Sequence, residues 1–260
     1  MHAAVRRHRA DEAVAHPVLT QRFLCPASAL GALGHTLGPN ESLRVGLIVD
    51  VGLDELGDVL AVVDADPRLL LETVELRIPG GDAAAAVERV LRTVGERAET
   101  TICIELSPAD ERWRAALLEV ARRGLWAKVR CGGVDAAAFP SAARLADFLI
   151  ASVVTDTPFK ATAGLHHALR YRDPATGFDH HGFVNLLLGT CRAVGGADDA
   201  AVQAALFIDD GHQLAAEARG LPRETEERAR SYFRAYGSCS TSEPIEDLAA
   251  LGLLEQGGRR

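Results

Sequence analysis

The chain has 260 residues, of which 48% are hydrophobic and 25% charged, and its formal net charge is −8. This length and apolar content suffice for one large core, so we expect a single domain over residues 1–260. The acidic balance argues against a nucleic-acid-binding protein, because contacts to phosphates need a basic surface.

The first segment, residues 1–17, is basic but lacks the apolar core of a signal peptide, and the sequence predicts no membrane-spanning stretch. The five cysteines have irregular spacing, which is typical neither of a disulfide framework nor of structural zinc. We therefore expect a soluble, cytoplasmic protein with reduced thiols. Whether it forms a homo-oligomer is left open.

Strand-like and helical patterns alternate along the first two thirds of the chain. Apolar and β-branched runs predict strands at residues 22–27, 44–50, 73–79, 101–107, 126–131 and 159–164. Amphipathic patterns predict helices at residues 28–37, 53–64, 83–98, 110–123 and 141–153. Strands and helices that alternate in this way indicate a parallel sheet with right-handed crossovers.

The last third is predicted to be richer in helices. Residues 180–196, 198–218 and 224–232 have helical patterns, and residues 243–255 predict a closing helix. Between them, residues 231–240 predict a seventh strand.

Charged residues follow one parity inside several of the predicted strands, while the intervening residues are apolar. The polar positions of this parity are Glu75, Arg77, Cys103, Glu105, Ser107, Lys128, Arg130, Lys160 and Thr162. A doubly wound sheet covered by helices on both faces has no place for these charges, whereas a barrel has a common interior. The sequence also lacks the glycine motifs of nucleotide-binding Rossmann and P-loop folds. We therefore predict a parallel (β/α) barrel of TIM type with a helix-rich C-terminal third.

Four segments, AKVRCGG…AFPS, PFKATAGLHHALR, HGFVNLLLGT and YGSCSTSEPIEDLAALGLL, resemble an uncharacterised bacterial protein family with a TIM-barrel-like α/β pattern. The resemblance covers almost the whole chain and implies no activity. Members of that family have a further N-terminal strand similar to LIDYAGLFPP, so we expect a barrel that is incomplete at the N-terminus. The segments FKATAG and AKVRCGG are also similar, as an analogy only, to the lysine-bearing strands of class I aldolases.

Lys128 and Lys160 are the only lysines among the 28 basic residues, and both lie in apolar predicted strands. An amine can lose its proton or form a Schiff base, which a guanidinium cannot. We therefore predict that Lys160 is a catalytic amine, that Lys128 is its neighbour or proton donor, and that Glu105 is the acid/base. The alternative is that both lysines are buried ion-paired residues without a catalytic role.

Histidines cluster after the Lys160 strand. His166 and His167 follow it directly, and His180 and His181 open the next predicted helix. Such positions suit a proton relay, for which we select His166 and His181. They also suit a divalent metal bound together with Glu105 or Asp50, although no HxH or HExxH spacing is present. Our main prediction has no metal and no other cofactor.

Glycines and arginines at predicted strand ends suggest a site for an anionic group, since backbone N–H groups and guanidinium groups bind phosphate or carboxylate. The glycine-bearing loops begin at Gly80, Gly132 and Gly237. The predicted substrate-binding residues are Glu75, Arg77, Arg130, Gly132, Gly133, Arg170, Ser238 and Ser240. Cys131 and Cys239 also lie at strand ends, where we expect buried, inert thiols.

These observations favour an enzyme that acts on a small anionic metabolite with a carbonyl group, through lyase or aldolase-like chemistry at a buried lysine. One alternative is a metal-dependent hydrolase or isomerase that uses His166, His167 and His181. The other is a non-catalytic barrel that binds an anionic ligand or pairs with a biosynthetic enzyme. No nucleic acid or membrane partner is predicted.

Overall fold

The computed structural model describes residues 1–79, 81–97 and 99–254. The chain divides into two compact units. Unit 1 contains Met1–Glu105 with Leu118–Trp126, and unit 2 contains Leu106–Leu117 with Ala127–Arg260. Helix α5 (Trp113–Arg122) is shared between them. The single domain expected from the chain length stays a prediction.

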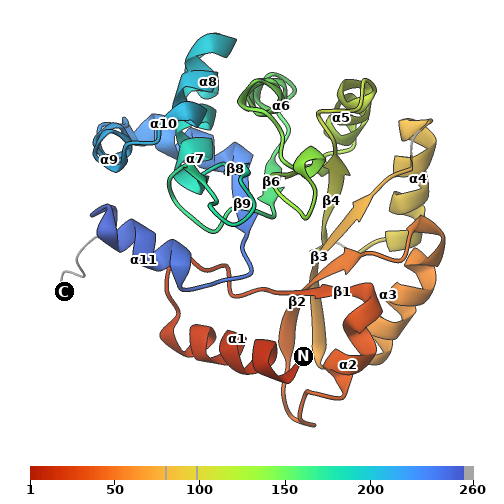
Figure 1. The fold of residues 1–260 in the computed structure, drawn as a ribbon. Coiled ribbons are helices and arrows are strands. Elements are labelled where there is room, and N and C mark those ends of the chain that lie inside the picture. Colours follow the sequence, from red (N-terminus) through yellow and green to blue (C-terminus); the bar gives the residue numbers. More distant parts are fainter. Residues whose placement is uncertain (80, 98, 255–260) are drawn as a thin grey trace. The chain divides into compact units, whose positions relative to one another are not determined.

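Unit 1 is built on parallel strands that follow one another in both the sequence and the sheet. The strands are β1 (Phe23–Pro26), β2 (Leu43–Val49), β3 (Leu69–Arg77) and β4 (Thr101–Leu106). The helices are α1 (His2–Val14), α2 (Leu30–Gly34), α3 (Leu56–Ala65) and α4 (Ala83–Val94), with short 3₁₀ turns at Ala27–Ala29 and Leu53–Glu55. Helices α3 and α4 pack together on the outer side of β3 (Figure 1).

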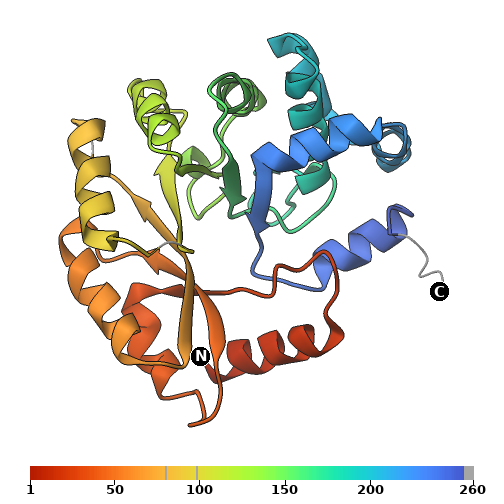
Figure 2. The same cartoon turned by 180° about the vertical axis from the view of Figure 1, so that it is seen from behind.

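Unit 2 has three parallel strands within its described residues, in the order β5 (Trp126–Arg130), β6 (Phe159–Thr162) and β9 (Phe233–Gly237). A small antiparallel hairpin joins β7 (Tyr171–Arg172) to β8 (Asp179–His180). The helices are α6 (Ala142–Val154), α7 (Phe183–Val194), α8 (Asp199–Phe207), α9 (Gly211–Arg219), α10 (Arg223–Tyr232) and α11 (Glu243–Ala250), with a 3₁₀ turn at Ala136–Ala138. Helix α10 leads directly into β9, and the chain continues from β9 to α11 (Figure 2).

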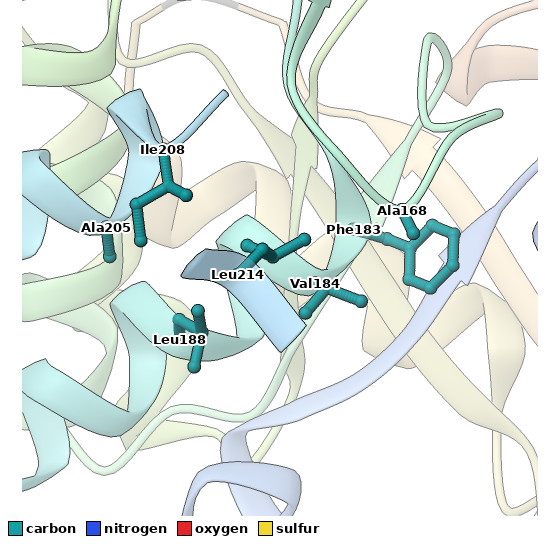
Figure 3. Packing of buried hydrophobic residues seen from close by; sticks show 7 residues of the cluster. All are labelled: Ala168, Phe183, Val184, Leu188, Ala205, Ile208 and Leu214. Carbon is teal, nitrogen blue, oxygen red and sulfur yellow. The ribbon is translucent and has the colours of Figure 1, made fainter. Parts of the chain in front are cut away.

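Helix α7 is the centre of the unit 2 core. It packs against α6, α8 and α10, and nearly all of its residues are buried, as its mostly apolar sequence requires. Figure 3 shows the apolar side chains gathered around it, which are Ala168, Phe183, Val184, Leu188, Ala205, Ile208 and Leu214. Phe183 also stacks on Tyr236 of β9, with 4.5 Å between ring centroids. The core therefore fixes the loop after β6, which carries Ala168, against α7.

The α/β class, the parallel strands and the helix-rich last third are confirmed, whereas a barrel of TIM type stays a prediction. The helix expected at residues 28–37 is a 3₁₀ turn followed by a short helix at Leu30–Gly34. The helix expected at residues 83–98 ends at Val94, because Gly95 turns the chain with φ 67°. The closing helix, expected over residues 243–255, ends at Ala250. The expected last residues of these two helices, Ala98 and Glu255, lie outside the described residues.

One helical stretch in the described residues, Ala136–Val154, is long and apolar enough to cross a membrane, contrary to the expectation of none. A core helix of a soluble protein passes the same test, and α6 buries Leu145, Phe148 and Leu149 inside unit 2. The stretch is therefore weak evidence for a membrane span.

Candidate functional site

The two lysines lie side by side on neighbouring strands of unit 2. Lys128 of β5 and Lys160 of β6 are register partners, and each residue is only 3% exposed. Because parallel strands lie about 4.8 Å apart and register partners point to the same face, the two amines share one surface of the sheet. On the opposite face, the fully buried Val129 and Ala161 are also register partners. The alternation predicted from the sequence is therefore present at both strands.

The strand ends above the lysines approach one another backbone to backbone. A Cβ atom added to Gly132 would lie 2.8 Å from the Cα atom of Gly164, and one added to Gly164 would lie 2.8 Å from the Cys131 carbonyl oxygen. Only glycine permits this approach. The Arg130 guanidinium donates to the Gly132 carbonyl at 3.3 Å, and Gly133 packs on the next 3₁₀ turn beside Ala138. The predicted anion-binding residues of this loop thus have a packing role as well.

The acidic residues and Arg77 lie on the polar face of unit 1. Register pairs Glu75 with Cys103 and Arg77 with Glu105 across β3 and β4. Arg77 Nη2 lies 2.8 Å from Glu105 Oε1, with side chains 67% and 9% exposed respectively, and Glu75 is fully buried. The alternation predicted from the sequence is therefore present in β3 and β4. Lys160, the predicted catalytic partner of Glu105, belongs to unit 2. The pairing of Glu105 with Lys160 therefore stays a prediction. Gly80 lies outside the described residues.

Two consecutive histidines after β6 each meet a carboxylate of α11. His166 Nδ1 lies 3.3 Å from Glu243 Oε2, and His167 Nδ1 lies 3.1 Å from Asp247 Oδ2. Asp247 also accepts the Ala168 backbone N–H at 2.8 Å. The two acids are four residues apart in a helix and so share one face, which lies along the loop.

Cys239 lies beside His166, and the expectation of a buried, inert thiol is wrong for this residue because it is exposed. Its Sγ atom is 3.6 Å from Nε2 and 3.7 Å from Nδ1 of His166. Ser238 Oγ lies 3.4 Å from the same Nδ1. Ser240, predicted to bind substrate, instead accepts the Glu243 N–H at the start of α11. Cys131 is buried as expected, and burial raises the pKa of its thiol to about 12.

The second histidine pair is held by packing. The ring of His181 is nearly fully buried, and its Nε2 lies 2.8 Å from the Pro140 carbonyl oxygen, to which it donates. Burial lowers the pKa of His181, which favours the neutral ring. The His180 ring lies against Phe139 at 4.8 Å and stacks on Tyr171 at 4.7 Å. Both rings therefore contribute to the packing around the hairpin.

A buried amide that the sequence reasoning did not select holds the end of the histidine loop. Asn185 Oδ1 accepts the Arg170 backbone N–H at 2.8 Å, and its Nδ2 donates to the carbonyls of Ala205 and Ile208 at 2.9 and 2.8 Å. A Cβ atom on Gly182 would overlap this amide oxygen. A buried asparagine in an apolar helix is the signal that could have identified this brace, since buried polar groups need partners.

Arg170, predicted to bind an anion, is engaged within unit 2. Its guanidinium lies 3.2 Å from Asp179 Oδ2 and 5.2 Å from the centre of the Phe207 ring.

The histidines have different partners, and within residues 1–79, 81–97 and 99–254 no group of three or more His, Cys, Asp or Glu side chains could hold a metal ion. The metal-dependent alternative therefore has no ligand set in the described part of the chain. No protein-family model, curated protein or solved structure matches the chain. The family resemblance stays a prediction.

Proposed function

We propose that the protein is a lyase that forms a Schiff base between Lys160 and a small anionic metabolite with an aldehyde or ketone group. The observation that carries this proposal is the register pairing of Lys128 and Lys160, both nearly fully buried, in a chain whose other permanently cationic side chains are arginines. A buried amine beside a second amine is a setting that suits nucleophilic catalysis.

In the proposed reaction, the neutral amine of Lys160 attacks the carbonyl carbon, a C–N bond forms, and water leaves after proton transfer. The iminium then accepts the electron pair of the bond between the α and β carbons of the substrate; this bond breaks as the β-hydroxyl group loses its proton, which leaves a carbonyl fragment and an enamine. Protonation of the enamine and hydrolysis of the iminium release the second fragment and restore the Lys160 amine. Lys128 or Glu105 supplies and removes the protons, and His166 or His181 is a second relay. Arg77 and Arg130 would hold the anionic group of the substrate, with Glu75 and the strand-end loops around it.

The proposal includes a cytoplasmic, TIM-type barrel that needs no cofactor, and it leaves the oligomeric state to be measured. Unit 2 supports the part that concerns Lys128 and Lys160, while the part that concerns Glu105, Glu75 and Arg77 rests on the shared parity of the strands.

Borohydride reduction in the presence of a panel of aldehydes, ketones and keto acids tests the proposal. We expect an irreversible adduct that peptide mapping assigns to Lys160. Lys160→Arg should abolish the adduct, and the matched variant Lys128→Arg should leave a slower adduct on Lys160. Circular dichroism of each variant checks that it is folded. If no carbonyl compound labels Lys160 in the folded wild-type protein, the Schiff-base proposal is overturned.

A further inference from the structure

We propose that Cys239, His166 and Glu243 form a second nucleophilic site, which does not require Lys160 and accepts an activated acyl group from an ester or thioester.

The thiol of this site differs from every other thiol in the chain. Cys239 is exposed, whereas the other four cysteines, all in the described residues, are buried. Burial raises the pKa of Cys25 and Cys191 to about 11, as it does more strongly for Cys131. Because the thiolate is the reacting form, these buried thiols are poor nucleophiles. Cys239 alone combines solvent access with a neighbouring base.

The three side chains have the order of a nucleophile, a base and an orienting carboxylate. Glu243 lies on the Nδ1 side of His166 at 3.3 Å, which favours a proton on Nδ1. Nε2 then carries the lone pair, and the Cys239 sulfur lies 3.6 Å from it. The sulfur is nearly equidistant from the two ring nitrogens, since its distance to Nδ1 is 3.7 Å. A rotation of the Cys239 or His166 side chain would bring the thiol into line with the Nε2 lone pair, and the thiol proton would then pass to Nε2 when the sulfur attacks.

The fold brings these residues together from three separate elements. Thr162 at the end of β6 is the register partner of Gly237 at the end of β9, so the loops that follow the two strands start side by side. The first loop carries His166, the second carries Cys239, and Glu243 begins α11. The side chains of His166 and Glu243 are 25% and 43% exposed, so a reactant can reach the site from solvent.

The chemistry is balanced within the site. The sulfur forms a bond to the acyl carbon, and the thiol proton moves to Nε2 of His166. The C–O or C–S bond of the substrate then breaks, and the leaving group takes the proton from the imidazolium. Water later attacks the thioester and releases the carboxylic acid, which restores the thiol.

The test uses the full chain and 4-nitrophenyl acetate under native conditions. We expect a burst of one equivalent of 4-nitrophenolate and an acetyl group on the peptide that contains Cys239, with the four buried cysteines unmodified. The rate should exceed that of N-acetylcysteine at the same pH by about tenfold or more, and this comparison needs no variant. Cys239→Ser should remove the burst, while the matched variant Cys191→Ser should retain it.

Variants of the neighbours separate a base from a chance contact. His166→Gln should slow acetylation about 100-fold, the size expected for loss of a general base. Glu243 is a positioning residue, so Glu243→Gln should slow the reaction and Glu243→Asp should restore part of the rate. Unfolding midpoints measured in parallel should be unchanged. A wild-type rate equal to that of N-acetylcysteine, or a folded His166→Gln variant with the wild-type rate, overturns the proposal. A Lys160 adduct in the carbonyl assay is unaffected by either outcome.

Discussion

Replacement of Asn185 by alanine should destabilise unit 2 by about 3–7 kcal/mol. The side chain is fully buried and makes three hydrogen bonds, to the Arg170 N–H and to the carbonyls of Ala205 and Ile208. The Ala205 carbonyl keeps a second donor, the N–H of Ile208 at 3.4 Å. Two backbone groups therefore lose their partner, each at about 1–3 kcal/mol, and the third bond adds about 1 kcal/mol. Such a loss is a large part of the total stability of a typical domain, about 5–15 kcal/mol.

Urea unfolding followed by circular dichroism measures this loss. The matched control is Thr190→Val on the same helix, because the Thr190 hydroxyl donates to the Leu186 carbonyl, which already accepts a bond within the helix. The control should lose less than about 1 kcal/mol. Hydrogen exchange should show lost protection of the Arg170 amide in Asn185→Ala. Equal stabilities of Asn185→Ala and Thr190→Val would refute the reasoning.

Two further predictions concern the same region. Gly182→Ala should destabilise the protein by about 3 kcal/mol or more in thermal or urea unfolding, because the new Cβ atom would overlap the Ala168 carbonyl oxygen. The control is Gly31→Ala, which should be neutral or slightly stabilising because a Cβ atom there meets nothing within 4 Å. Burial lowers the pKa of His181, so its neutral form stabilises the fold above the unfolded value of about 6.5, and this stability is lost as the pH falls below that value. Urea titrations at several pH values should therefore show that the free energy of unfolding falls less between pH 7 and pH 5 in His181→Gln than in the wild-type protein. Glutamine also keeps a donor for the Pro140 carbonyl. The same pH dependence in both proteins would contradict the assignment.

The parity of charged residues was readable from the sequence because a strand has a period of two. It predicted correctly that Lys128 and Lys160 share a face with Arg130 and that Glu75, Arg77 and Glu105 share another strand face. The alternation does not determine which residues of neighbouring strands lie opposite one another, because this register depends on how each crossover connects the strands. The structure pairs Arg77 with Glu105 across β3 and β4, a contact that the pattern of a single strand does not specify.

The thiol site could not be predicted because its members are distant in the chain. Cys239 and His166 are separated by 73 residues, and no local spacing indicates their contact. The hairpin and the bends of the histidine loop depend on local backbone conformations that the sequence does not indicate. Ala163, for example, has φ 61°, which is uncommon for a residue other than glycine.

Three contacts hold the histidine loop in place, which is what a catalytic role of the contact between His166 and Cys239 requires. Gly164 is held against Cys131 at the start of the loop, Ala168 donates to Asp247 in the middle, and Arg170 donates to Asn185 at the end. A loop fixed at three points keeps His166 in one place, and a base held in place reacts faster than a mobile one. Removal of the last anchor should therefore slow Cys239 acetylation in the fraction of Asn185→Ala that remains folded. An unchanged rate in that fraction would mean that the Asn185 hydrogen bonds are not needed to position His166.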